Sequence, residues 1–162
     1  MRRIVFFVLF GCVLSSCEDD NNFSDIPFLE YRGHEFKVEQ DSRIIEMELY
    51  FNDRDGNIGL ELEDSLEPFN PGSKYFNNLW VWVYTVRNGV QTAANPDTSI
   101  GFSGRIPNLT PEGQNKSLEG TIFYDISASA LAPGDTILCE FLLLDRDLNR
   151  SDTARSPLIR IQ

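Results

Sequence analysis

The sequence predicts an all-β fold built from two packed antiparallel sheets, and three observations lead to this expectation. Apolar and polar residues alternate with a period of two through most of the chain, which is typical of half-buried strands. Clusters of Gly, Asn, Asp and Pro, the residues that turns require, separate the alternating segments. No stretch carries an apolar period of 3.6 residues for more than two helical turns, so no long amphipathic helix is expected.

Seven segments have the strand pattern. Residues 43–51 alternate most cleanly, and residues 79–86 are apolar on both faces and end in the turn sequence Arg87-Asn88-Gly89. Seven short strands with polar turns favour a seven-stranded antiparallel immunoglobulin-like sandwich, with a Greek-key barrel as the main alternative. The expected strands span residues 27–39, 43–51, 79–86, 99–106, 118–126, 136–144 and 153–161.

A local resemblance supports the sandwich. Residues 126–135 read ISASALAPGD and precede the sixth expected strand. This segment resembles the E–F corner of fibronectin type III domains, in which a leucine plugs the end of the sandwich before a Pro-Gly turn. The resemblance implies that Leu131 is the plug and that Pro133-Gly134 forms the turn.

The first residues have the layout of a secretory signal. Arg2 and Arg3 precede an apolar stretch, residues 4–13, which at about ten residues is too short to span a bilayer. The stretch leads into Leu14-Ser15-Ser16-Cys17, which resembles the lipobox of bacterial lipoproteins, where the cysteine is acylated and becomes the first residue of the mature chain. We therefore expect a signal peptide at residues 1–16, a tether at residues 17–26 and one immunoglobulin-like β-sandwich at residues 27–162.

The tether begins with an acidic run, Glu18-Asp19-Asp20. It resembles the export tag that follows the lipid-bearing cysteine in surface lipoproteins of the Bacteroidota. The resemblance implies an outer-membrane protein that faces the cell exterior, attached to the membrane through its N-terminal lipid. The alternative is a solvated spacer without a sorting role.

The net charge and the number of cysteines limit the partners and the disulfides that the chain can have. The chain has 162 residues and a formal charge of −11, and loss of Arg2 and Arg3 with the signal leaves 12 basic against 25 acidic residues. Such a surface repels phosphate backbones, so no nucleic-acid partner is expected. Loss of Cys12 with the signal and lipidation of Cys17 leave Cys139 alone, which we expect to be buried and inert.

One short pattern occurs twice. Residues 53–57 and 145–149 both read DRDxN, and each follows an expected strand. Alternating Asp and Asn in a turn can direct several oxygen atoms to one side, which suits Ca²⁺. In a seven-stranded sandwich the two loops lie at the same end. The candidate calcium ligands are therefore Asp53, Asp55, Asn57, Asp145, Asp147 and Asn149.

A purely structural role for these loops is the alternative that we favour. Asp, Asn and Gly are the residues that turns need, and Arg54 and Arg146 can neutralise the carboxylates without metal. The stretch from Asp53 to Leu60 resembles the DxDGNxGL loop of small uncharacterised Bacteroidota lipoproteins, a family that implies no activity. An EF-hand is not expected, because strands flank the loop and Ile58 stands where that motif requires glycine.

Trp80, Trp82 and Tyr84 fall on one face of the third expected strand. They can form a platform that stacks on sugar rings, but we favour a core or partly covered position, because an exposed row would be a large apolar patch. His34 is the single histidine and has no flanking catalytic motif, so no enzyme is expected. The sequence thus predicts a non-enzymatic binding or adhesion module with a protein or glycan ligand. The alternatives are an accessory subunit of an outer-membrane complex and a glycan-binding domain.

Overall fold

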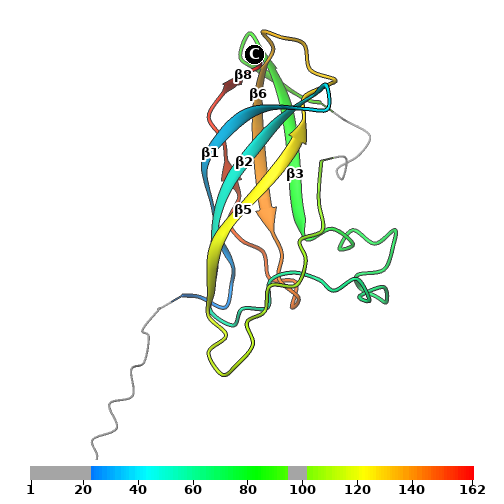
Figure 1. Cartoon of the computed structure of the whole chain (residues 1–162), viewed down its shortest axis with the longest axis vertical. Helices are drawn as coiled ribbons and strands as arrows, with labels where there is room; N and C mark the ends of the chain where they lie inside the picture. Colours follow the sequence, from blue (N-terminus) through cyan, green and yellow to red (C-terminus); the bar gives the residue numbers. More distant parts are fainter. Residues whose placement is uncertain (1–22, 95–101) are drawn as a thin grey trace, which may run out of the picture.

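The computed structural model describes residues 23–94 and 102–162, and it folds into two antiparallel sheets in a sandwich-like arrangement (Figure 1). One sheet has the order β1-β2-β5, and in the other β4 pairs with β3, β3 with β6, and β6 with both β7 and β8. The strands are β1 (Phe28–Glu39), β2 (Ser42–Asp53), β3 (Leu79–Arg87), β4 (Val90–Ala93), β5 (Leu118–Ser127), β6 (Thr136–Leu143), β7 (Ala154–Arg155) and β8 (Ile159–Arg160). The predicted all-β sandwich is confirmed, with eight strands in place of seven.

Alternation along the strands builds the core between the sheets. In β2, Ile45, Met47 and Leu49 are fully buried, whereas the residues between them lie on the outer face. Phe141 on β6 is the largest fully buried side chain of the opposite sheet. Burial of these apolar side chains away from water is the main force that holds the two sheets together.

The prediction of a fourth strand at residues 99–106 is wrong. The structure places the fourth strand, β4, at Val90–Ala93, and residues 99–101 of the expected segment lie outside the described residues. Of the remainder, Gly104 forms a single bridge with Leu79. The error arises because β4 is a short edge strand with all four residues exposed, so no apolar alternation marks it.

The seventh expected strand is divided in two. Its residues form β7 and β8, which both pair with β6 but are separated by Ser156, Pro157 and Leu158. Proline has no N–H to donate to a ladder, which explains the interruption. Ser156 compensates through its hydroxyl, which accepts a hydrogen bond from the Cys139 N–H at 2.9 Å.

The loops gather at two ends of the domain (Figure 1). The start of β1, the long β2–β3 loop, the β5-preceding loop and the β6–β7 loop lie at one end, which we call the N-terminal end. The β1–β2 hairpin, the β3–β4 hairpin, residues 128–135 and the C-terminus lie at the other, which we call the far end. Asn88 and Gly89 in the β3–β4 hairpin both have positive φ, which confirms the predicted turn.

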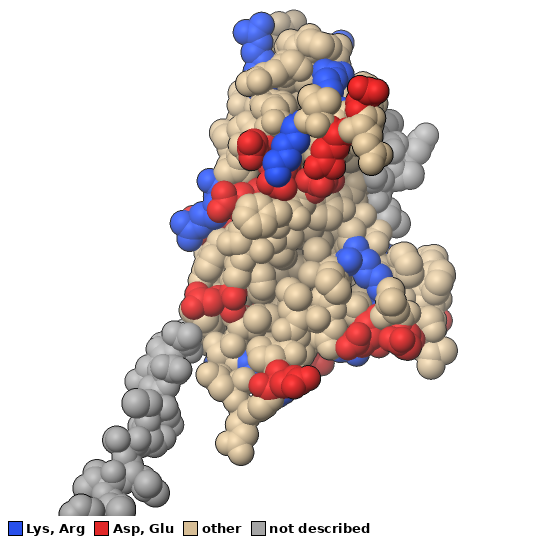
Figure 2. Space-filling view, in the orientation of Figure 1, with Lys and Arg blue, Asp and Glu red and all other residues tan. Residues whose placement is uncertain are grey.

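Acidic and basic side chains are intermingled over the upper part of the face seen in Figure 2, and a broad area without charge lies below them. The β1-β2-β5 sheet carries ion pairs on its surface, among them Lys37 with Glu46 and Arg32 with Glu30. Paired charges of this kind contribute little stability at an exposed surface. The broad area without charged side chains is therefore the most distinctive feature of the face seen in Figure 2.

Candidate functional site

The first DRDxN loop starts at the last residue of β2. Asp53 Oδ2 accepts a hydrogen bond from the Asn57 N–H at 3.1 Å, which closes the loop on itself. Gly56 adopts a φ of 61°, and a Cβ there would lie 1.8 Å from the carbonyl oxygen of Lys116. Glycine is therefore required at this position by both backbone conformation and space.

The second DRDxN loop repeats this conformation. Asp145 Oδ1 accepts a hydrogen bond from the Asn149 N–H at 2.7 Å, and Oδ2 accepts one from Asn149 Nδ2 at 2.7 Å. Leu148, at the position that corresponds to Gly56, has a φ of 67°. The two loops thus share a backbone fold as well as a sequence pattern, even though leucine tolerates that φ poorly.

The two loops contact each other directly. Ile58 and Asp145 form an antiparallel bridge, and the Arg146 N–H donates to the Asn57 carbonyl at 3.2 Å. The Asn57 side-chain amide donates to Asp55 at 3.0 Å and to Asp147 of the other loop at 3.1 Å. The structure therefore brings the six predicted oxygen-bearing residues into one cluster, which we call the paired-loop cluster, and the predicted juxtaposition is confirmed.

The paired-loop cluster holds buried negative charge. Asp53 is 0% exposed and Asp145 is 1% exposed. Burial and, after it, the adjacent Asp55 carboxyl together raise the pKa of Asp53 to about 7. Burial also raises the pKa of Asp145, against the opposing effect of its hydrogen bonds from Asn149. Ionised carboxylates in such a site are costly unless a cation or donors compensate them.

The arginines of the two loops do not supply that compensation. Arg54 pairs with Asp25, with its Nε 2.6 Å from Oδ1, and Arg146 forms a bidentate pair with Asp64 at 2.8 and 3.1 Å. Among the described residues neither arginine forms an ion pair with the cluster. The expectation that these two arginines neutralise the carboxylates is therefore wrong, because both point to partners outside the loops.

Three oxygen atoms of the first loop have no hydrogen-bond donor. They are Asp53 Oδ1, Asp55 Oδ1 and Asn57 Oδ1, and they make up three of the four buried side-chain atoms without a partner in the described part of the chain. All three are acceptors, and buried acceptors are rarely left unpaired. Within residues 23–94 and 102–162, no group of three or more His, Cys, Asp or Glu side chains is arranged so that it could hold a metal ion, so a metal here needs the Asn57 oxygen among its ligands.

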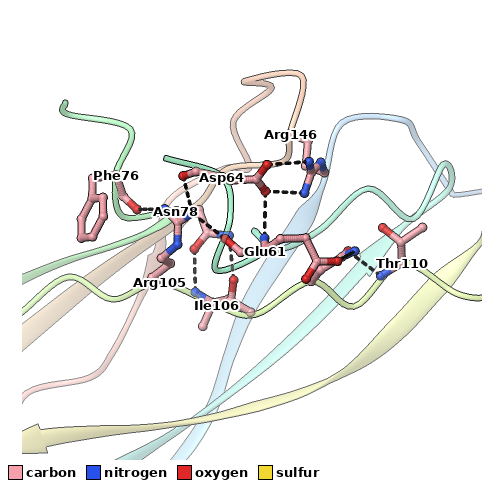
Figure 3. A network of polar contacts seen from close by, with 9 residues as sticks. Glu61, Asp64, Phe76, Asn78, Arg105, Ile106, Thr110 and Arg146 are labelled. Carbon is pink, nitrogen blue, oxygen red and sulfur yellow. Dashed lines mark hydrogen bonds and ion pairs between the residues drawn. The ribbon is translucent and has the colours of Figure 1, made fainter. Parts of the chain in front are cut away.

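A polar network next to the cluster fastens the long β2–β3 loop (Figure 3). Arg105 donates to the carbonyl oxygens of Phe76, Glu61 and Asp64 at 2.7 to 2.9 Å. The Glu61 N–H donates to Asp64 at 2.8 Å and, with Arg146, holds the pKa of Asp64 below its usual range. These contacts join residues far apart in the chain, and no local sequence signal marks them in advance.

Asn78 anchors the same region from the core side (Figure 3). It is 3% exposed, its Oδ1 accepts a hydrogen bond from the Ile106 N–H at 2.6 Å, and its Nδ2 lies 3.5 Å from the Ile106 carbonyl oxygen. The Asn78 side chain therefore bonds the Ile106 backbone N–H and C=O as a neighbouring strand would, just before β3 begins. Sequence reasoning missed it, because a single Asn in a polar loop is not distinctive.

The aromatic row on β3 faces outward. Trp80, Trp82 and Tyr84 are half-buried, whereas the alternating residues Leu79, Val81 and Val83 are buried in the core. Of the favoured prediction, a core or partly covered position, the structure shows the partly covered form. Trp80 is covered by Tyr75, which stacks on it at a centroid distance of 6.3 Å, and by the Arg150 guanidinium 5.2 Å from its ring.

A surface hollow lies at the far end, between β1, β2 and the C-terminal segment. It has a volume of about 260 Å³ and largely apolar walls. The Arg43 guanidinium beside it donates to the carbonyl oxygens of Leu131 and Ala128 at 2.5 and 3.2 Å. The lining residues are Phe36, Lys37, Val38, Arg43, Ile44, Ala128, Ile161 and Gln162.

Cys139, His34 and Cys17 are the remaining residues whose side chains could carry chemistry. Cys139 is fully buried, and burial raises the pKa of its thiol to about 12, which agrees with the inert role expected for it. His34 lies on β1, with its Nδ1 2.7 Å from the Tyr31 hydroxyl. Cys17 lies outside the described residues.

The comparisons with known proteins add no relative. No family model, curated protein or solved structure matches the chain. The described residues also contain no helix of the length and apolarity needed to cross a membrane. The class that the fold itself defines is a single antiparallel β-sandwich with a cluster of carboxylates at its N-terminal end.

Proposed function

We propose that this chain is a lipid-anchored protein of the bacterial cell envelope, held in the outer membrane through Cys17 and facing the cell exterior, whose β-sandwich is a non-enzymatic binding or adhesion module. The Leu-Ser-Ser-Cys17 pattern after a short apolar stretch supports the anchor. The acidic run after Cys17 supports export to the surface. A firm attachment follows if the anchor carries more than one acyl chain, since one chain alone binds only marginally.

The path of the N-terminal segment supports one orientation of the domain. Arg54 in the first DRDxN loop pairs with Asp25, and its N–H donates to the Ser24 carbonyl at 3.0 Å. Residues 24 and 25 therefore leave the domain beside the paired-loop cluster, at the N-terminal end (Figure 1). A lipid on Cys17 then puts that end nearest the membrane and presents the far end outward.

The hollow at the far end is the observation that supports this function best. Its apolar walls lie beside Val38, which is 74% exposed, and the hollow is at the end that a lipid anchor turns away from the membrane. An apolar side chain of a protein partner fits such a hollow, and the positive charge of the Arg43 guanidinium beside it, which donates to backbone carbonyl oxygens, favours a partner with a neighbouring acidic group. We therefore assign recognition to the far end.

The location is tested by protease treatment of intact cells together with the variant Cys17→Ala. The expected result is that external protease removes the wild-type protein and that Cys17→Ala abolishes its membrane association. A protein that intact cells protect, or a Cys17→Ala variant that stays with the outer membrane, contradicts the proposed location.

The binding surface is tested by gentle detergent extraction and chemical cross-linking. Val38→Asp at the far end is compared with Leu62→Asp, a matched control that is 92% exposed at the N-terminal end. The expected result is a cross-linked complex that Val38→Asp removes and Leu62→Asp leaves intact. A monomeric wild-type protein, or equal effects of the two variants, contradicts recognition at the far end.

A glycan-binding role is the second candidate, and the outward aromatic row favours it. Trp80 and Trp82 pack edge to face at 6.1 Å on the outer face of β3, and Tyr84 continues the row beside Glu140. Half-exposed aromatic rings flanked by polar groups suit sugar rings. If tryptophan fluorescence is insensitive to acrylamide and does not change with host or bacterial glycans, this candidate is removed.

An accessory role in an outer-membrane complex is the third candidate. The edge strand β4 is exposed along its whole length and has one free side in the described sheet. Edge strands of this kind can add a strand from another protein. The antiparallel register turns the Gln91 N–H away from β3, because Gln91 lies opposite Val86 in a non-hydrogen-bonded pair. Proline substitution at Gln91 is therefore expected to disrupt such a complex and to spare the β3–β4 ladder, and unchanged co-purification of the variant would exclude pairing through β4.

A further inference from the structure

We propose that the paired-loop cluster is a Ca²⁺ site, in which Asp53, Asp55 and Asn57 of the first loop supply ligand oxygens and Asp145 and Asp147 of the second loop complete the negative charge around the ion. This site is independent of the proposed function: it requires neither the lipid nor a partner at the far end. It also replaces the purely structural role that the sequence alone favoured for these loops.

The unpartnered oxygens are the first argument. Asp53 Oδ1, Asp55 Oδ1 and Asn57 Oδ1 come from alternating residues of one tight loop, and no donor within the described residues reaches them. Asp53 is 0% exposed, so bulk water does not replace the missing donor. A cation satisfies three acceptors at once, and alternating oxygen donors in a turn are how Ca²⁺ loops supply them.

The uncompensated charge is the second argument. Four carboxylates belong to the cluster, two of them fully buried, while Arg54 and Arg146 bind Asp25 and Asp64 instead. The only donors to the carboxylates that the loops provide are backbone N–H groups and the side-chain amides of Asn57 and Asn149. Buried charges of one sign require a counter-ion, because their repulsion adds to the cost of removing them from water.

The donor set selects the metal. All candidate ligands are carboxylate or amide oxygens, and the cluster contains no His or Cys. Zn²⁺ prefers nitrogen and sulfur, and Mg²⁺ demands near-ideal octahedral geometry and retains much of its water. Ca²⁺ accepts six to eight oxygens in an irregular arrangement, which suits two loops that approach from different strands.

The position of the cluster indicates what the ion does. Asp53 ends β2 in one sheet, and Asp145 follows β6 in the other. Arg54, between two ligand residues, also holds Asp25 of the N-terminal segment. An ion here joins the two sheets and stiffens the junction at which the chain enters the domain, so its effect is on stability and orientation.

The test uses the full-length protein in detergent, stripped of metal with EDTA and titrated with CaCl₂. We expect saturable binding by calorimetry and a rise in melting temperature of about 5 °C or more once Ca²⁺ exceeds its dissociation constant about 100-fold. MgCl₂ at the same concentrations is expected to have a smaller effect. Absence of heat and of a melting shift at millimolar Ca²⁺ overturns the proposal.

The variant Asp53→Asn separates loss of the site from loss of the fold. Its amide keeps an oxygen that can accept the Asn57 N–H while removing one buried charge. We expect Ca²⁺ affinity to fall at least tenfold, whereas melting in EDTA stays at or above the wild-type value. Asp152→Asn, which removes an exposed carboxylate near the second loop, is the matched control and should bind Ca²⁺ as the wild type does. Equal responses of Asp53→Asn and wild type to Ca²⁺ would also overturn the proposal.

Discussion

Gly59 links the first acidic loop to the neighbouring segment, and its replacement by alanine is the most sharply defined perturbation of this end of the domain. Gly59 has a φ of 98°, and a Cβ would lie 1.9 Å from the Pro107 carbonyl oxygen and 2.6 Å from the Asn108 Cα. The obstacle is backbone, so no side-chain rotation relieves it. The two segments must move apart to admit the methyl group.

That movement breaks identifiable contacts. The Leu60 N–H donates to the Ile106 carbonyl at 3.0 Å, and the Leu109 N–H donates to the Ile58 carbonyl at 2.9 Å, one on either side of Gly59. Losing two backbone hydrogen bonds costs about 2 kcal/mol. The positive φ adds about 1 kcal/mol for any residue with a Cβ. We therefore expect Gly59→Ala to lower the free energy of unfolding by about 3 kcal/mol.

Gly72→Ala is the matched control. Gly72 has a φ of 90°, close to that of Gly59, but a Cβ there meets no atom within 4 Å. It should cost only the backbone term of about 1 kcal/mol. Both variants are compared with the wild type by urea unfolding in EDTA. Equal destabilisation of the two would refute the claim that close backbone contact, and not conformation, fixes glycine at position 59.

Three further predictions concern the core, a thiol and the N-terminal segment. Phe141→Ala should lower the free energy of unfolding by about 3–5 kcal/mol, because Phe141 is fully buried. Phe123→Ala, at a 62% exposed position, should change the free energy of unfolding by less than about 0.5 kcal/mol. Similar costs of the two variants in urea unfolding would show that the core is assigned incorrectly. Burial raises the pKa of Cys139 to about 12, so its thiolate does not accumulate between pH 7 and 9. Iodoacetamide should therefore label Cys139 only after the protein unfolds. Labelling of the native protein that increases over this pH range would contradict the burial of the thiol. Arg54→Ala breaks an exposed pair with Asp25 and should leave global stability nearly unchanged, because solvent screens such pairs. It should nevertheless speed proteolysis near residues 24–25, and unchanged cleavage would show that Arg54 does not hold this segment.

The period-two pattern predicted most of the fold, because strands that bury one face must alternate. It failed where that reason did not apply. β4 is an exposed edge strand with nothing to bury, and β3 is apolar enough on both faces that alternation does not show which face is inside. The buried side of β3 became clear only from its partner β6, whose core residues lie opposite Val81 and Val83.

The paired-loop cluster was predictable because its two halves share a sequence pattern and the topology of a sandwich places them together. The ion-pair partners of Arg54 and Arg146 could not be predicted from the sequence. Asp25 and Asp64 are separated from Arg54 and Arg146 by 29 and 82 residues, and no local pattern encodes such pairs. This difference matters, because arginines that pair elsewhere leave the cluster with negative charge that a bound cation would balance.

The intact mass of the purified mature protein tests the central claim of a lipid-anchored domain most directly. A lipid-anchored protein should begin at Cys17 and carry the added mass of a diacylglyceryl group, with or without a further acyl chain. A chain that retains residues 1–16, or that begins at Cys17 without added lipid, would contradict the anchor and with it the outward orientation of the far end.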